Sequence, residues 1–381
     1  MDCIKDAKNL VQLIRESLGK THKLDQVDWR RTFYVAKSHS LSTIYYDVIK
    51  NRDDVSEDVK LITRNSALAQ IHQQVQQDYY AQEIYKRLYE NKIKFMPMKG
   101  AVLRKLYDVP EHRLSCDVDI LFDKSRIETV NEILETLDFR KEKEWHNGVV
   151  TVEMHESLFE KPSWGCEYFA NVWERLKTDD GIKYYFSDED FYLYFMTHTA
   201  KHFYNGGFGI RTVLDVYEFN QAKNLDREYL KREFTKLGLC KFVEQVEEVA
   251  NAWFGDDLEA VDKENDLGEL ILSSGVYGIE RNSVMVKNVK KKASARKTKL
   301  RYLMVALFPS YKVMKSLYPF LKYLPFMLPF MWVYKWFVVL FTRRKSIKKF
   351  TKNIDAMSDK KVSKFQNVLE STEFPVDKYG Y

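Results

Sequence analysis

The chain has 381 residues, of which 45% are hydrophobic and 30% are charged, a composition that argues against a disordered protein and allows two or three packed regions. Its four cysteines, Cys3, Cys116, Cys166 and Cys240, show no C-x-x-C spacing, which argues against a structural zinc site or a disulfide framework. The formal net charge of +6 is compatible with a polyanionic substrate but is too small to require nucleic acid.

Residues 1–93 are predicted to form a helical N-terminal region, because apolar residues recur at helical spacing. The last helical run opens at Ser56 and continues to about Tyr89 without proline or glycine, with acidic residues in its first turn. Its five glutamines between positions 70 and 77 are interpreted as a solvated face. No apolar segment follows a basic start at the beginning of the chain, so we expect no secretory signal and a cytoplasmic protein.

Residues 94–160 carry the clearest strand signals. The adjacent residues Asn147 and Gly148 stand between two β-prone runs, which predicts a hairpin. This segment is therefore expected to form a small mixed sheet with accompanying helices. Strands are predicted at 95–98, 118–122, 139–145 and 149–156, and helices at 101–107 and 125–137.

The strongest candidate site is the stretch Cys-Asp-Val-Asp-Ile-Leu-Phe at 116–122. Alternate side chains of a strand point the same way, so Asp117 and Asp119 would share one face with their Cα atoms about 6.5 Å apart. Two carboxylates so close repel each other unless a cation lies between them, and oxygen ligands suit Mg²⁺ or Mn²⁺. Taken alone, such a pair also fits the solvated face of an edge strand.

Two neighbouring features favour the metal site. Gly100 follows a short apolar strand and opens a helical run, an arrangement that presents backbone N–H groups to a phosphate. If Val152 and Met154 face the core, Glu153 and His155 share the opposite face of their strand. A third acid on a neighbouring strand is what metal-dependent phosphoryl or nucleotidyl transfer requires.

A family resemblance rests on four stretches: Lys99-Gly100-Ala-Val-Leu, Tyr107, Arg113-x-Ser115-x-Asp117-x-Asp119-Ile-Leu, and Val152-Glu153-Met-His155. With these the chain resembles the polymerase-β-type nucleotidyltransferase superfamily. Within it the chain is most similar to a poorly characterised bacterial family with a K-G…R-x-x-x-D-x-D core. The resemblance covers residues 94–160 most sharply and the helical flanks more faintly.

The resemblance implies roles for these residues. Asp117, Asp119 and Glu153 would be catalytic and would bind Mg²⁺ or Mn²⁺, with Glu153 as the third ligand or as the base for the attacking hydroxyl. The nucleotide would be bound by Lys99, Gly100, Arg113 and Ser115, and the residues around the site would be His155, His198, His202 and Asp215.

Simpler roles stay open for several of these residues. Lys99 also fits a surface lysine at a strand end, and Arg113 would look the same in a structural ion pair. His155 fits a hydrogen-bonded neighbour of the acidic cluster better than a substrate contact. Ala101 stands where the wider superfamily has serine or glycine, which leaves room for a catalytically inactive nucleotide-binding or interaction module.

Helices are expected to dominate residues 161–255. His198 and His202 share one helix face, but no glutamate stands between them, which argues against a hydrolytic zinc site. They are expected to contact Asp215 or to line a cleft, while Arg211 and Asp215 could pair with each other or face the site.

The C-terminal part, residues 256–381, carries a basic run and an apolar run. Residues 287–301 hold eight Lys or Arg and no acid, which fits a nucleic-acid backbone or an anionic bilayer, although a solvated face is favoured. Residues 302–341 are apolar, but prolines and Lys335 interrupt their best stretch, so a buried or interfacial helix pair is expected rather than a spanning helix. A peripheral membrane contact through 287–345 stays open.

The expected fold is α+β, with a small mixed-sheet nucleotidyltransferase palm at 94–160 flanked by largely helical regions at 1–93 and 161–381. The expected function is metal-dependent transfer of a nucleoside monophosphate from an NTP, with ATP preferred, to an unidentified hydroxyl or phosphate acceptor.

Overall fold

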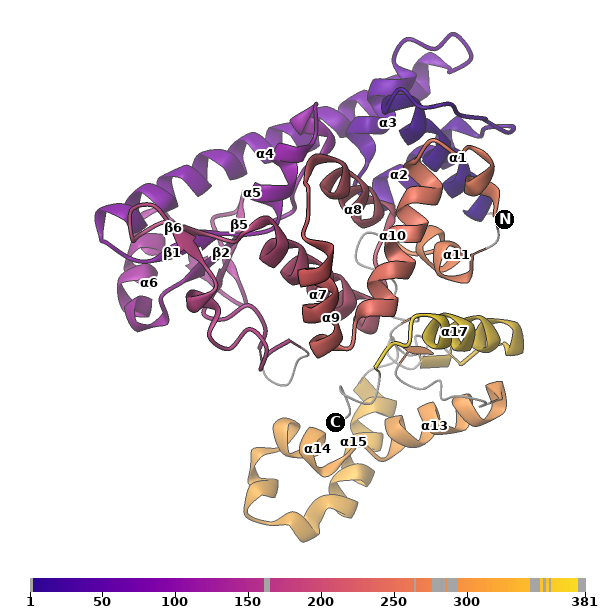
Figure 1. Ribbon diagram of the computed structural model, residues 1–381. Coiled ribbons are helices and arrows are strands. Elements are labelled where there is room, and N and C mark those ends of the chain that lie inside the picture. The colour runs from indigo at the N-terminus through magenta and orange to yellow at the C-terminus, as the bar shows by residue number, and fades with distance from the viewer. Residues whose placement is uncertain are drawn as a thin grey trace.

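The computed structural model describes residues 3–160, 165–263, 265–275, 294–342 and 358–375, together with Asn282, Met285, Val286, Phe350, Thr351, Ile354 and Asp355. The fold is mixed α/β, with one small five-stranded sheet flanked by helices, which confirms the predicted fold class (Figure 1). The predicted basic residues Lys287, Lys290, Lys291 and Lys292 lie outside the described residues.

The sheet has the strand order β1-β2-β5-β4-β3, and only the central β2–β5 pair is parallel. The hairpin predicted at Asn147-Gly148 is confirmed, because Trp145 on one strand pairs with Val152 on the next. The single strand predicted at 139–145 is wrong: a turn closed by the Glu142 N–H and the Glu144 carbonyl divides it into two. The strands are β1 (Phe95–Pro97), β2 (Val118–Phe122), β3 (Arg140–Lys141), β4 (Trp145–His146) and β5 (Thr151–His155).

Helices α4 (Glu57–Glu90) and α6 (Ile127–Thr136) cover one face of this sheet. Ile120 and Val152 pack into that layer, and both are fully buried. Side chains alternate along a strand, so the neighbours of Ile120 in β2 and of Val152 in β5 point to the opposite face of the sheet. A second and larger core of buried side chains lies on that side. The alternation therefore places the odd-numbered positions of β2 and β5 on the face that carries polar side chains.

The N-terminal helices α1 (Cys3–Ser17), α2 (Trp29–Ser38) and α3 (Ser42–Ile49) belong to the second core, and Figure 1 shows α4 running from them to the sheet. The long helix predicted from Ser56 is confirmed. The interpretation of its glutamines as a solvated face is wrong for two of them, since Gln74 and Gln77 are buried. Glutamine is polar but not charged, so a helix can bury it wherever a backbone group completes its hydrogen bonds, as Ser115 N–H does for Gln74.

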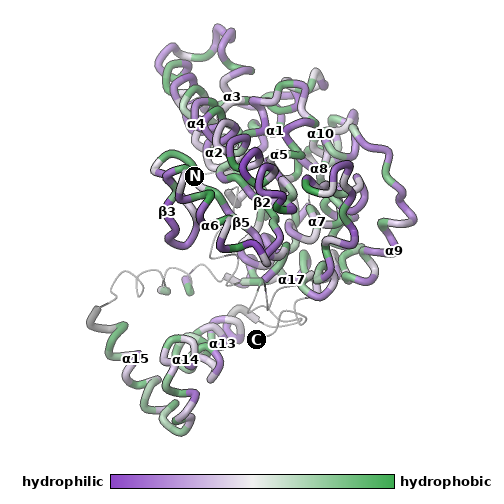
Figure 2. The backbone as a smooth tube through the Cα atoms, turned by 90° about the vertical axis from the view of Figure 1, so that its left-hand side faces the viewer, coloured by the Kyte–Doolittle hydropathy of each residue, from purple (hydrophilic) through white to green (hydrophobic). Residues whose placement is uncertain are grey.

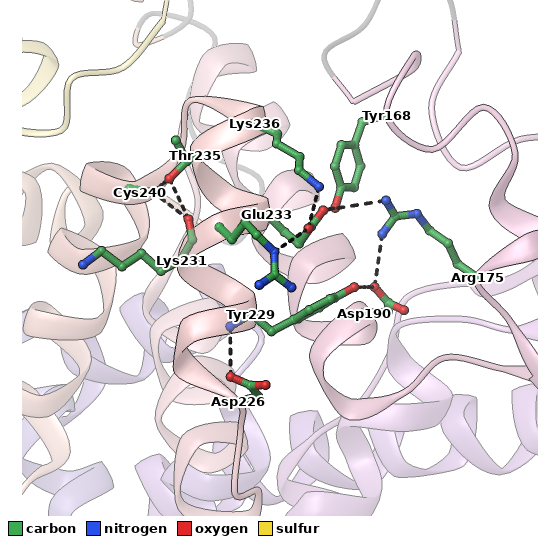
Figure 3. A network of polar contacts seen from close by, with 11 residues as sticks. Tyr168, Arg175, Asp190, Asp226, Tyr229, Lys231, Glu233, Thr235, Lys236 and Cys240 are labelled. Atoms are coloured by element: carbon green, nitrogen blue, oxygen red, sulfur yellow. Dashed lines mark hydrogen bonds and ion pairs between the residues drawn. The ribbon is translucent and has the colours of Figure 1, made fainter.

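The helices that follow the sheet complete the second core: α7 (Asp188–Asn205), α8 (Ile210–Ala222), α9 (Arg227–Leu237), α10 (Cys240–Phe254), α11 (Asp266–Leu272) and α17 (Asp359–Ser371). A polar network, drawn in Figure 3, ties α9 to α7 and to the loop before it. Its centre is the buried Glu233, which accepts from the Tyr168 hydroxyl at 2.6 Å and from Lys236 at 2.6 Å. Arg175 bridges Glu233 and Asp190, so the loop before α7 is held to both helices.

A second, two-stranded sheet lies in the region predicted to be helical. It consists of β6 (Lys177–Thr178) and β7 (Tyr184–Tyr185), joined by a turn at Asp180-Gly181. Phe95 N–H donates to the Ile182 carbonyl, so this hairpin covers the free edge of β1. The Asp-Gly pair is a hairpin signal, but strands of two residues carry too little alternation to be recognised.

The C-terminal part contains α13 (Ala295–Leu307), α14 (Tyr311–Leu317) and α15 (Leu328–Thr342). Figures 1 and 2 show these helices standing apart from the sheet, with α15 strongly apolar in Figure 2. Of the two alternatives predicted for this apolar run, a buried or an interfacial helix pair, the buried one is wrong, because many of its large side chains are exposed. Within the described residues, each helix is too short or too polar to cross a bilayer.

Candidate active site

Two acidic residues face each other on the central strand pair. Asp119 on β2 and Glu153 on β5 are partners in the parallel register, on the face opposite α4 and α6. His155, two residues further along β5, brings its Nε2 to 2.8 Å from Asp119 Oδ1 and 3.4 Å from Glu153 Oε2. One ligand atom from each of the three lies within 4.8 Å of the others. Their compactness follows from strand alternation and the one-to-one register.

Asp117, which directly precedes β2, lines two of the cavities at this cluster but is not one of the three mutually close groups. Burial raises the pKa of Asp117, and the Asp119 charge adds to the rise. The pKa of Glu153 is also raised, first by burial and then by the charges of Asp119 and Asp117. The three carboxyl groups therefore repel one another, as expected of a cluster suited to a cation.

Asp119 is held as a carboxylate. Burial opposes its ionisation, but Lys99 and His155 outweigh burial and lower its pKa to about 2. Lys99 Nζ lies 3.5 Å from Asp119 Oδ2. Lys99 itself has φ of 26°, a conformation that costs a non-glycine residue about 1–3 kcal/mol and is concentrated at functional sites.

Gly100 and Ser115, both predicted to bind nucleotide, are in close contact. A Cβ atom at position 100 would overlap the hydroxyl oxygen of Ser115, so the packing requires glycine there. Ser115 is fixed in turn by its N–H, which donates to Gln74 Oε1 at 2.7 Å. The start of α5 (Gly100–Leu103) is thus pressed against the loop that leads into β2.

Arg113 and Asp215 form an ion pair beside the cluster. Arg113 Nε donates to Asp215 Oδ1 at 2.6 Å, and the side chains are only 8% and 2% exposed. The Tyr107 hydroxyl donates to the same oxygen at 2.8 Å. Arg211, also a candidate partner for Asp215, donates to the Leu114 carbonyl. Of the two roles that the sequence left open for Arg113, the geometry matches the structural ion pair.

His198 and His202 on α7 lie above the carboxylates, with ring centroids 4.4 Å apart. Burial, followed by the charge of Lys99, lowers the pKa of His202 to about 4 and that of His198 well below its usual value. Both rings are therefore neutral at neutral pH. They offer hydrogen-bonding nitrogens to the cleft but add no positive charge.

Lys201 was not predicted as a site residue. It lines the cleft beside Lys99 and Glu153, and burial and the Lys99 charge lower its pKa. The signal was present in the sequence, because positions 194, 198 and 201 fall on one helical face. The cationic side chains that line the cleft are thus Lys99, Lys201, Arg211 and Arg113, of which Arg113 is paired with Asp215.

Three cavities meet at the acidic cluster. The largest, about 430 Å³, lies between α4 and the start of α5 and reaches Asp117 and Asp119. A second, about 300 Å³, lies beneath α7 and α8 and is lined by these four cationic side chains. A third, about 340 Å³, opens beside Glu153 and His155. The carboxylates therefore stand where two different molecules could meet.

Gln77 is the second residue that sequence reasoning missed. It lines the 430 Å³ cavity, is 1% exposed, and neither atom of its amide has a hydrogen-bond partner among the residues that the structure describes. A buried polar group without a partner costs about 1–3 kcal/mol, so a protein rarely keeps one without a use. The sequence offered no signal, because Gln77 is one of five glutamines with similar surroundings.

Comparison with known proteins supports a specific family. The family model described as "uncharacterised nucleotidyltransferase" matches residues 25–255, a span that includes the five-stranded sheet, α4 and helices α7 to α10. No curated protein and no solved structure matches the chain. Since the match covers more than half of the sequence and contains the acidic cluster, the chain belongs to this family of uncharacterised nucleotidyltransferases.

Proposed function

We propose that the protein transfers a nucleoside monophosphate from ATP to a hydroxyl or phosphate acceptor. The observation that carries this proposal is the position of Asp119 and Glu153, paired across parallel strands at the point where three cavities meet. A transferase must bring two substrates to one reacting centre. The family assignment supports nucleotidyl transfer as the reaction class.

The donor set fits a hard divalent cation. Carboxylate oxygens from Asp119 and Glu153, with Asp117 beside them, are the ligands that Mg²⁺ and Mn²⁺ prefer. Such an ion, when bound, would polarise the α-phosphate and neutralise charge on the departing pyrophosphate. His155 would orient the Asp119 carboxylate through its 2.8 Å hydrogen bond.

The triphosphate is assigned to the cavity beneath α7 and α8. Lys99, Lys201 and Arg211 line it, and their charges oppose those of the phosphates. His198 and His202 are neutral, and the charge of Arg113, which also lines the cavity, is paired with Asp215. Lys99, Lys201 and Arg211 therefore supply the positive charge for the phosphates. Lys99 also pairs with Asp119, so it would link the phosphates to the carboxylate cluster.

The acceptor is assigned to the cavity beside Glu153. In the transfer step an acceptor oxygen forms a bond to the α-phosphorus, the bond between the α-phosphorus and its bridging oxygen breaks, and pyrophosphate leaves. Glu153 takes the proton of the acceptor hydroxyl.

The nucleobase is assigned to the 430 Å³ cavity, whose wall includes Gln77. A turn of this side chain into the cavity would present to the base an amide that has no partner among the described residues. A glutamine amide can accept from the adenine N6 amino group and donate to N7, a pairing worth about 1–3 kcal/mol of discrimination between bases. This supports ATP over GTP, which presents two acceptors at the same edge. The base and the phosphates would then lie on either side of Gly100 and Ser115, which line both cavities.

Calorimetry of ATP binding with Mg²⁺ tests the site. Asp119→Asn should weaken binding strongly, because the variant loses a metal ligand and the partner of Lys99. Equal affinity in wild type and variant would contradict the site. Incubating the protein with α-labelled ATP and a cell extract tests transfer: label should move to one extract component with release of pyrophosphate. Binding without any label transfer would instead support a catalytically inactive nucleotide-binding module.

The base assignment has a matched control on the same helix. Gln77→Leu should reduce the preference for ATP over GTP by about 1–3 kcal/mol. Gln73→Leu, at an exposed position of α4, should leave the preference unchanged. An unchanged preference in Gln77→Leu, with Mg²⁺-dependent ATP binding intact, would refute the role of Gln77 but leave the acidic site standing.

A further inference from the structure

The segment 294–342, which contains α13, α14 and α15, exposes an apolar surface. Among the described residues, most of the exposed large apolar side chains lie between positions 300 and 337. Tyr323, Phe326 and Phe330 are 77%, 68% and 65% exposed. A soluble surface rarely carries so many large apolar groups close together in one segment, and such patches mark contact sites for proteins or membranes.

The helices that carry these exposed side chains are fixed against each other. The Trp332 indole donates to the Pro309 carbonyl at 3.0 Å, and the Trp336 indole donates to the Leu307 carbonyl at 2.7 Å. The Phe308 ring packs edge-on against both indoles. These contacts fix α15 against the end of α13, so the exposed aromatic side chains belong to a defined surface.

All the charged side chains of segment 294–342 are positive. Residues 294–342 contain eight Lys or Arg and no Asp or Glu. Lys312, Lys315 and Lys322 are exposed beside the apolar side chains of α14 and the turn that follows it. The absence of acid extends along the sequence from Arg281 to Ile354, a stretch with nineteen Lys or Arg. The complementary partner is therefore negatively charged as well as apolar.

We propose that segment 294–342 docks on the surface of an anionic lipid bilayer. A bilayer interface offers anionic headgroups over hydrocarbon, which matches lysines interspersed with Phe, Tyr and Leu. The helices lie on the bilayer rather than cross it, since α15 has fifteen residues and a spanning helix needs about twenty. Lys335 in α15 is bonded to the Ala306 carbonyl inside the segment, so it does not oppose insertion of the exposed face.

Flotation of the full-length protein with lipid vesicles tests this docking without nucleotide, independently of the proposed reaction. The protein should float with vesicles of mixed phosphatidylglycerol and phosphatidylcholine, and salt should weaken the binding. Vesicles of phosphatidylcholine alone should bind much less. Lys312→Gln, Lys315→Gln and Lys322→Gln together should lower partitioning more than about tenfold, since each cation near the surface contributes roughly fivefold.

An apolar variant and a matched control complete the test. Replacing Tyr323, Phe326 and Phe330 with serine should abolish flotation, whereas the same replacement of Leu61, Leu68 and Tyr79, which are 56%, 50% and 60% exposed on α4, should not. If the apolar variant does not fold, the lysine variant carries the test. The proposal is overturned if the wild type stays at the bottom at low salt, or if both serine variants float equally. It is also overturned if the wild type forms a lipid-free oligomer that the 323/326/330 variant dissociates, because a second copy would then cover the surface.

Discussion

Replacing Arg113 with methionine should destabilise the protein strongly. The substitution removes the cation that lies 2.6 Å from the buried carboxylate of Asp215, while the length of the side chain is largely kept. Only 2% of the Asp215 side chain is exposed, so water cannot replace the lost partner. Leaving one member of a buried ion pair without its partner costs about 3–5 kcal/mol, and we expect the free energy of unfolding to fall by that amount.

Two further variants distinguish the loss of the ion pair from a general loss of packing. Tyr107→Phe removes only the second donor to Asp215 Oδ1, at 2.8 Å, and should cost about 2 kcal/mol, less than Arg113→Met. The double variant Arg113→Met with Asp215→Leu removes both charges and should be more stable than the sum of the single effects implies, by at least about 1 kcal/mol.

Urea unfolding followed by circular dichroism, with ATP calorimetry on the same samples, measures the series. If Arg113→Met unfolds at the wild-type urea concentration but no longer binds ATP, Arg113 contacts phosphate directly and the ion-pair interpretation is wrong. A Tyr107→Phe effect larger than that of Arg113→Met would also refute the reasoning, because it would show that the hydroxyl, and not the charge, stabilises Asp215.

Three further predictions concern separate parts of the molecule. Gly100→Ala should lower label transfer at least about tenfold, because its methyl group would displace Ser115, and Ser115→Gly should partly restore transfer in the double variant. Burial lowers the pKa of His39 to about 4, below its unfolded value of 6.5. The stability that neutral His39 contributes is therefore complete above pH 6.5 and is lost as the pH falls toward 4. Between pH 7 and pH 4, the free energy of unfolding of the wild type, measured by urea titration, should fall by about 3 kcal/mol more than that of His39→Asn. Glu233→Gln should destabilise the protein, as measured by urea unfolding, by breaking the network that joins α7 and α9, while leaving the affinity for Mg²⁺ and ATP near wild type. An equal loss of stability and affinity would show that this network also positions the site.

The parts of the site that lie on strands could be predicted, because strand geometry is local. Alternation along β2 and β5 is enough to place Asp119 and Glu153 on one face, and the Asn-Gly turn is enough to bring β5 into the sheet. The parallel register that puts these two residues opposite each other also depends on the crossover through α6. That crossover is visible as a helical pattern between the strands.

The environment of Arg113 could not be predicted in the same way. Its partner Asp215 is 102 positions away in the sequence, and the pair forms only when α8 packs beside the loop before β2. Likewise, the sequence shows that Gln74 and Gln77 lie on one helix face but not that this face meets the Ser115 loop. Contacts between distant segments depend on packing, which periodicity and residue type do not specify.

The same long-range packing has a consequence for the proposed reaction. The predicted N-terminal region supplies Gln74 and Gln77, the predicted palm supplies the carboxylates, and the predicted C-terminal region supplies Lys201 and Arg211. Each group lines the cavities only because all three regions are packed together. A loss of packing at the Arg113–Asp215 pair, which joins the loop before β2 to α8, should therefore reduce activity before the chain unfolds, since it shifts Arg211 and the carboxylates relative to each other. In partial urea, Arg113→Met should lose label transfer at concentrations that leave its helical circular dichroism intact. Glu233→Gln, whose network contains no residue that lines the three cavities, should lose both together.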